Sequence, residues 1–123
     1  MFGCGICADL DAGIVRGVNM IARVWKGWTT PENADAYERF VRGSVLPSLE
    51  RIDGYRGGYI LRKAVDHEVE FMVMTTFDSL EAVRDFAGDD YTVPVIEPEA
   101  RELLARVEPV ARHYDVKLAP EDR

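Results

Sequence analysis

The chain has 123 residues, 47% of them hydrophobic and 30% charged, which is enough for one domain with a single core and too little for two. Its formal net charge of -7 at pH 7 disfavours binding to nucleic acid or to an anionic membrane, because both need a concentrated basic surface. No apolar run approaches the ~20 residues of a membrane-spanning helix, and the N-terminus lacks the pattern of a secretory signal. We therefore expect a cytoplasmic protein that has neither nucleic acid nor membrane as a partner.

The N-terminal segment carries a Cys-x-x-Cys motif formed by Cys4 and Cys7. This spacing is typical of a redox dithiol or of half a zinc site. A redox pair normally follows a strand and begins a helix, whereas MFGCGIC is rich in glycine and unperiodic, and no later cysteine completes a zinc site. We expect two free thiols, and we interpret residues 1–19 as either a disordered extension or a mis-assigned start ahead of Met20.

The first predicted elements are a strand and a long helix. IARVWKGW is rich in strand-forming residues and runs to Thr30, which can cap a helix that has Pro31 at its first position. Apolar residues then recur every three or four positions until Gly54 closes the helix. Pro47 has no N–H to donate, so a kink or break is expected between Gly43 and Pro47.

Two runs of strand-forming residues follow, YRGGYILRK from Tyr55 to Lys63 and EVEFMVMTTF from Glu68 to Phe77. The short polar turn between them predicts an antiparallel hairpin. The Gly57-Gly58 pair inside the first run indicates a bulge or the close approach of another part of the chain.

The last third of the chain is predicted to hold two short helices and a final strand. Asp78, with Glu81 three residues later, predicts a capping box ahead of a helix that Gly88 ends. A proline-containing loop comes next, followed by a helix in EPEARELLARV (97–107) and a strand in EPVARHYDVKL (108–118).

The order of elements over residues 20–118 predicts an α+β domain with the split βαβ, ferredoxin-like arrangement and an antiparallel sheet, followed by a tail at 119–123. Alternate residues of the strand from Glu68 to Phe77 are apolar on both faces. Helices can cover only one face of such a sheet. A second copy of the chain is the expected cover for the other face, so we predict a homodimer through the open sheet face.

Several stretches between Met20 and Leu118 give the chain a resemblance to a known family: MIARVWKGWT, ADAYERF, FDSLEAVRDFAG, YTVPVIEPEARELL and HYDV. Together they resemble the antibiotic biosynthesis monooxygenase (ABM) family of the dimeric α/β-barrel superfamily. The resemblance implies a homodimer whose two sheets face one another, with a small pocket in each subunit between sheet and helices. It also implies an oxidoreductase: some members oxidise aromatic polyketides with oxygen and no metal or flavin, and relatives in the superfamily bind and degrade haem.

His113 is one of two histidines and lies on the predicted last strand. A neutral imidazole could take the proton of a phenol and so activate an electron-rich ring toward oxygen, which makes His113 the candidate catalytic residue. The alternative is a histidine that caps the end of the sheet or crosses a dimer interface.

Arg23 and Trp25 point to the same side of the first strand. A cation beside an indole could hold a flat anionic phenolate by charge and stacking. The alternative is an interfacial tryptophan whose neighbouring arginine meets a carboxylate.

Further substrate-binding candidates lie on several elements: Tyr37, Arg62, Phe77, Phe86 and Tyr91. Each has an alternative as a core or surface residue, and Tyr91 is of interest because the loop that contains it could form a lid. His67 is expected to be solvated in the hairpin turn. The acidic residues between positions 89 and 99 match no metal-binding spacing, so no metal site is predicted.

The main functional hypothesis is a cofactor-independent, monooxygenase-like enzyme acting on a small aromatic or quinol-like molecule. One alternative is a small-molecule-binding or sensing dimer without turnover. The other is a haem-binding or haem-degrading protein, in which His113 or His67 would be the histidine ligand.

Overall fold

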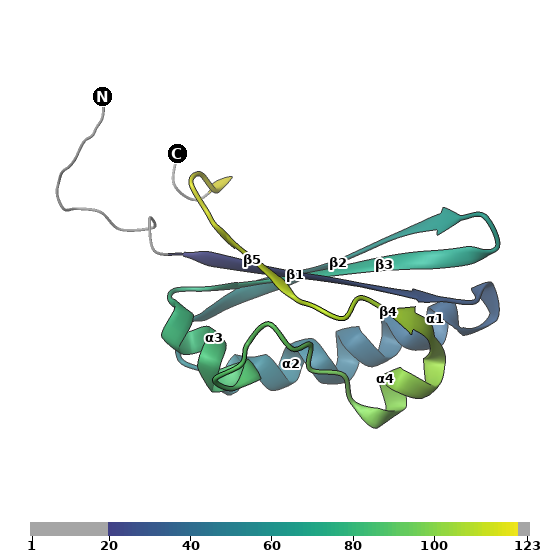
Figure 1. Ribbon diagram of the computed structural model, residues 1–123, viewed down its shortest axis with the longest axis horizontal. Coiled ribbons are helices and arrows are strands. Elements are labelled where there is room, and N and C mark those ends of the chain that lie inside the picture. The colour runs from purple at the N-terminus through teal and green to yellow at the C-terminus, as the bar shows by residue number, and fades with distance from the viewer. Residues whose placement is uncertain (1–19, 121–123) are drawn as a thin grey trace, which may run out of the picture.

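A computed structural model describes residues 20–120, so the expectations for residues 1–19, Cys4 and Cys7 among them, lie outside the described residues. In chain order the elements are β1 (Ile21–Thr29), α1 (Pro31–Phe40), η1 (Val41–Val45), α2 (Leu46–Ser48), η2 (Leu49–Arg51), β2 (Tyr55–Val65), β3 (Glu68–Phe77), α3 (Leu80–Ala87), α4 (Pro98–Leu103), β4 (Leu104–Val107) and β5 (Arg112–Asp115). Figure 1 shows all helices on one face of a single twisted sheet. The predicted α+β, ferredoxin-like fold with an antiparallel sheet is confirmed.

The sheet places β1 at its centre, because the strand order is β2-β3-β1-β4 and β5 also pairs with β1. The register sets Arg23 opposite Thr75 of β3 on one side and opposite His113 of β5 on the other. Residues directly opposite one another project to the same face of an antiparallel sheet. One row of three polar side chains therefore crosses the sheet on a common face.

The first helix begins as predicted, with the Thr30 side chain accepting a hydrogen bond from the Asn33 N–H at 3.3 Å. Of the kink or break expected between Gly43 and Pro47, the structure has an irregular helical turn and no break. Instead the chain forms the π-helical turn η1 and then continues as α2, with the Leu46 N–H bonded to the Val41 carbonyl. A π-turn absorbs an extra residue and keeps the backbone bonded, so the helix passes through the proline without ending.

The hairpin and the expected special role of its glycines are also found. A bulge lies between Tyr55 and Gly57, and a Cβ on Gly58 would come within 3.0 Å of Leu46 Cδ2. The missing side chain at Gly58 thus lets the long helix approach the sheet closely.

Two expectations for the last third of the chain are wrong. The cap of α3 is Ser79, whose hydroxyl accepts from the Ala82 N–H at 3.2 Å, and not Asp78. The segment 97–107 is not all helix, because its last four residues form β4, which pairs with β1 from Gly27 to Thr29. Pairing with an open strand edge outweighs the local helical pattern there.

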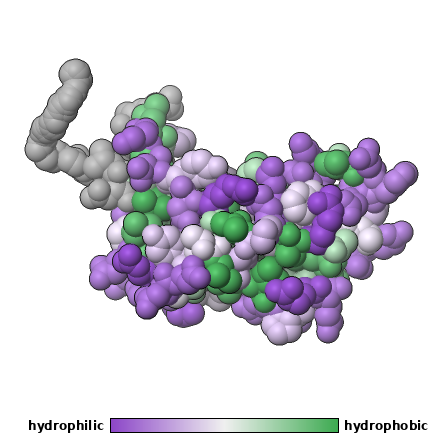
Figure 2. All heavy atoms as spheres, in the orientation of Figure 1, coloured by the Kyte–Doolittle hydropathy of each residue, from purple (hydrophilic) through white to green (hydrophobic). Residues whose placement is uncertain are grey.

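The core lies between the sheet and the helices, in two clusters around Phe77 and Phe71, both fully buried. The opposite face of the sheet carries exposed apolar side chains: Tyr59, Leu61 and Tyr114. Figure 2 also shows apolar groups gathered over the connection between α3 and α4, with hydrophilic groups around them. No helix within residues 20–120 is long and apolar enough to span a membrane.

Candidate functional site

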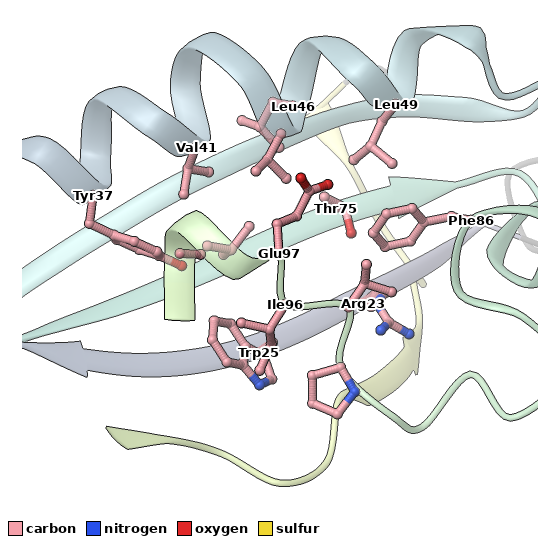
Figure 3. Close-up of a pocket in the computed structure, with 15 residues that line it drawn as sticks. Arg23, Trp25, Tyr37, Val41, Leu46, Leu49, Thr75, Phe86, Ile96 and Glu97 are labelled. Atoms are coloured by element: carbon pink, nitrogen blue, oxygen red, sulfur yellow. The ribbon is translucent and has the colours of Figure 1, made fainter. Parts of the chain in front are cut away.

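A pocket opens to solvent between the covered face of the sheet, the long helix and the connection from α3 to α4, and its volume is about 70 Å³. Its lining is mostly apolar: Arg23, Trp25, Tyr37, Val41, Val45, Leu46, Leu49, Val73, Thr75, Phe86, Pro94, Val95, Ile96, Glu97 and Ala100. Aromatic walls with a few polar groups are typical of sites for small organic ligands. Figure 3 shows these side chains converging from strands, helix and loop.

Arg23 is the buried cation of this pocket, with only 4% of its surface exposed. Its Nη1 donates to the Tyr91 carbonyl and lies 3.0 Å from His113 Nε2, and its Nη2 donates to the Val93 carbonyl at 3.2 Å. Among residues 20–120 no carboxylate forms an ion pair with this guanidinium. Burial lowers the pKa of Arg23 to about 10, so it stays charged at neutral pH.

The same three bonds leave part of the guanidinium free. An arginine has five N–H groups, and the contacts to Tyr91, Val93 and His113 occupy three of them. The Nε–H and one Nη2–H have no partner within the described part of the chain. Arg23 therefore ties the loop at 91–93 to the sheet and keeps donors for a further acceptor.

His113 contacts the Arg23 guanidinium and does not line the pocket. Burial, and then the positive charge of Arg23, lower the pKa of His113 below its ordinary value, which favours the neutral ring. Because Nη1 of Arg23 is a donor, Nε2 of the neutral ring accepts and the proton sits on Nδ1. The ring edge also packs against Tyr91, with centroids 5.0 Å apart.

Aromatic side chains form the walls. The Trp25 indole is fixed by a hydrogen bond from its Nε1 to the Glu108 carbonyl at 2.9 Å. The Phe86 ring lies over the Arg23 guanidinium, 5.4 Å from Cζ to the centroid. Tyr37, from α1, packs edge-on against Phe71 at 4.8 Å. These contacts hold flat aromatic surfaces in the walls of the pocket that contains the cation.

Two further polar groups face the pocket. Thr75 is 5% exposed, and its hydroxyl forms no hydrogen bond with another residue of the described chain. Glu97 precedes α4 in the cap position, yet its side chain makes no capping bond, and no described residue pairs with its carboxylate. Figure 3 shows the Glu97 side chain turned toward the side of the pocket that Leu46 and Thr75 form.

The residues predicted from the sequence fall into three groups. Arg23, Trp25, Tyr37 and Phe86 line the pocket. His113 and Tyr91 contact Arg23 from outside it.

The remaining two predicted residues lie elsewhere. Phe77 is fully buried in the core beside Phe86, at 6.2 Å between ring centroids. Arg62 lies on β2 and pairs with Asp35 and Glu38 of α1, at 3.0 Å and 2.8 Å.

Sequence reasoning missed Thr75 and Glu97 as pocket residues. A signal existed for Thr75, because it interrupts the apolar alternation of Phe71, Val73 and Phe77 on the covered face. The sequence offered no comparable signal for Glu97, which lies among other acidic residues in a loop.

The lining does not suit a histidine-ligated haem. It contains no histidine: His113 is engaged by Arg23, and His67 lies in the turn of the β2–β3 hairpin. Within residues 20–120 no three His, Cys, Asp or Glu side chains are grouped so as to hold a metal ion.

Comparison with solved structures gives matches over most of the chain. A conserved protein from Methanosarcina mazei Go1 matches with a TM-score of 0.63 and 16% identity, covering 82% of this chain and 96% of that one. A candidate antibiotic biosynthesis monooxygenase from Nitrosomonas europaea matches with 0.60 and 15%, covering 87% and 98%. A variant of SnoaB, a cofactor-independent oxygenase from Streptomyces nogalater, matches with 0.57 and 14%, covering 83% and 97%.

A scan against protein-family models gave no match, and neither did a search of curated proteins. At these identities the structural matches establish the fold and no more. The chain has the fold of antibiotic biosynthesis monooxygenase-type proteins, with an aromatic pocket built around a buried cation.

Proposed function

We propose that the protein is a monooxygenase-like enzyme that acts without a tightly bound cofactor on a small aromatic or quinol-like molecule. The observation that carries the proposal is the buried Arg23 guanidinium, which has no carboxylate partner among the described residues and keeps two free N–H donors. A buried charge without a counter-ion is unfavourable, so an anionic ligand oxygen would gain from binding there. Matches to SnoaB and to ABM-type proteins support the reaction class at the level of the fold.

In this proposal Arg23 binds the oxygen of the substrate as a phenolate, while Trp25 and Phe86 hold the ring. Charge on the phenolate raises the electron density of the ring, which then reacts with oxygen. A ring C–H bond breaks and a C–O bond forms with one atom of O₂, and the other atom leaves as water. The substrate supplies the electrons, so a quinol and O₂ give a hydroxyquinone and water.

The test is oxygen uptake with a panel of hydroquinones. Replacement Arg23→Gln removes the charge and is expected to lower uptake by about a hundredfold, the usual size for losing a charged group that stabilises a developing anion. Arg101→Gln, an exposed arginine on α4, is the matched control and is expected to leave uptake unchanged. Saturable binding of the panel with no oxygen consumption would refute the enzyme and favour the binding or sensing protein.

His113 is proposed to act through Arg23, as a positioning residue. Its Nε2 accepts from Nη1 and so fixes the guanidinium. His113→Ala is expected to lower oxygen uptake at least about tenfold. His113→Gln, which keeps an acceptor, is expected to recover most of the rate and to lose the fall at acid pH that protonation of the ring causes. Unchanged rates in His113→Ala would remove this residue from the mechanism.

We also propose that a second copy of the chain covers the open face of the sheet. The support is the group of exposed apolar side chains there, Tyr59 at 56% and Leu61 at 48% among them. An isologous interface pairs such a surface with itself. Leu61→Glu is expected to shift the mass measured by light scattering from dimer to monomer, whereas Leu80→Glu on α3 is not. A monomeric unmodified protein would refute the dimer.

A further inference from the structure

The polar groups of the pocket differ in the hydrogen bonds that they can make. The Arg23 guanidinium only donates, and the Glu97 carboxylate only accepts. The Thr75 hydroxyl does both. A ligand that fills the pocket must therefore offer an acceptor to Arg23 and a donor to Glu97.

Thr75 is already placed to share a ligand group with Glu97. It is buried, its hydroxyl has no partner among residues 20–120, and it lies directly opposite Arg23 in the β1–β3 register. An unsatisfied buried hydroxyl is unfavourable and is found where something else supplies the bond. Figure 3 shows Glu97 and Thr75 on the same side of the pocket.

Glu97 is an exposed residue, and no hydrogen bond or ion pair with a described residue fixes the direction of its side chain. Its side chain neither caps α4 nor forms an ion pair with a described residue, although the backbone places it at the start of that helix. The neighbouring Glu99 is also exposed and does not line the pocket. The two carboxylates therefore differ in direction: Glu97 lines the pocket and Glu99 does not.

We propose that Glu97 and Thr75 determine specificity by binding a second hydroxyl group of the ligand, on the same ring whose first oxygen lies at Arg23. This hydroxyl donates to the Glu97 carboxylate and accepts from the Thr75 hydroxyl, so that both groups are satisfied. The inference rests on the proposed function, since it takes the aromatic ligand to lie in this pocket. It narrows the substrate to a dihydroxylated ring that carries no second anionic group, because an anion would be repelled by Glu97.

The test compares hydroquinone with 4-methoxyphenol, in which one hydroxyl is methylated and cannot donate. Both are titrated without oxygen, so that no turnover is needed, and binding is followed by the fluorescence of Trp25 in a Trp28→Phe background. Charge-assisted hydrogen bonds lead us to expect about tenfold tighter binding of hydroquinone. Glu97→Gln keeps the shape but loses the charge, and is expected to reduce this preference to about twofold.

Two further variants complete the experiment. Glu99→Gln is the matched control and is expected to keep the full preference. Thr75→Val removes the hydroxyl at constant shape and is expected to reduce the preference as well. Equal affinity for the two compounds in the unmodified protein, or an undiminished preference in Glu97→Gln, would overturn the inference.

The outcome separates the inference from the proposed function. A preference that depends on Glu97, together with no oxygen uptake, would support the specificity site and refute the enzyme. Oxygen uptake on hydroquinone and 4-methoxyphenol at equal rates, with no effect of Glu97→Gln, would support the enzyme and refute the specificity site. Absence of binding to both compounds would overturn the ligand pocket itself.

Discussion

Gly27 gives the Trp25 indole the space that it occupies in the pocket wall. A Cβ at position 27 would lie 2.9 Å from Trp25 Cη2 and 3.2 Å from Leu104 Cδ2. Carbon atoms in contact normally stay about 3.5–4.0 Å apart. The far end of the indole is held by the bond from Nε1 to the Glu108 carbonyl, so the ring cannot move freely away. Gly27→Ala is therefore expected to push the ring toward the pocket.

The expected change in stability follows from two opposing terms. Overpacking of this kind costs about 1–3 kcal/mol. Alanine in place of glycine gains about 0.4–1 kcal/mol by restricting the unfolded chain. We expect the free energy of unfolding of Gly27→Ala to fall by about 1 kcal/mol, with weaker ligand binding because Trp25 narrows the pocket.

Gly43→Ala is the matched control, because a Cβ there meets no atom within 4 Å and the residue lies in the helical turn η1. We expect this variant to gain about 0.5–1 kcal/mol. Both are measured by urea unfolding, and the emission of Trp25 is recorded in a Trp28→Phe background. If Gly27→Ala is stabilised as much as Gly43→Ala, with an unchanged Trp25 spectrum, then the indole does not lie where the structure has it.

Three further predictions concern Thr75, His113 and Tyr37, which lie in or next to the pocket. Thr75→Val removes a buried hydroxyl that has no partner in the described chain, so the free energy of unfolding is expected to stay the same or rise by about 1 kcal/mol in denaturant titrations. The pKa of His113 is lowered in the folded state, so its contribution to stability is present above its ordinary value of 6.5 and lost as the pH falls below it; His113→Gln is expected to lose less stability over that range. Burial raises the pKa of Tyr37 to about 12, so its contribution is complete below pH 10 and lost as the pH rises toward 12, and Tyr37→Phe is expected to show a smaller loss of melting temperature there.

The parts of the fold that the sequence predicts are those encoded locally. Thr30 before Pro31 marks the start of α1, and the two apolar runs separated by a short polar turn define the β2–β3 hairpin. Each of these signals acts over a few residues, so it does not depend on what the rest of the chain does. These local signals also set the order of strands and helices along the chain, and that order predicts the ferredoxin-like fold.

The parts that the sequence did not predict depend on contacts between distant segments. Leu104–Val107 carries a helical pattern, but β1 offers it an unpaired edge at Gly27, Trp28 and Thr29, and the segment becomes β4. Pro47 predicts a kink or break, but it does not indicate which; the helix is packed on the sheet on both sides of the proline, so the irregularity takes the form of a π-turn and the helix continues. In both cases tertiary packing outweighs a local preference.

The candidate site repeats this division. Arg23 and Trp25 alternate on one strand, so their shared face could be read from the sequence, and both line the pocket. The neighbours of Arg23 could not be predicted from the sequence. His113 and Thr75 lie opposite Arg23 only because of the registers of two non-local strand pairs. A slip of one residue in either pairing would move the partner to the other face of the sheet.

The surroundings of Arg23 in the row His113–Arg23–Thr75 explain how the folded protein tolerates a buried cation that has no carboxylate partner among the described residues. A neutral imidazole on one side and the loop carbonyls of Tyr91 and Val93 supply acceptors that solvate the guanidinium without cancelling its charge. A carboxylate in place of His113 would form an ion pair and leave little attraction for a ligand anion. The acceptors around Arg23 thus stabilise the folded state and leave its charge unneutralised, while the Thr75 hydroxyl on the opposite side of the row has no partner within residues 20–120.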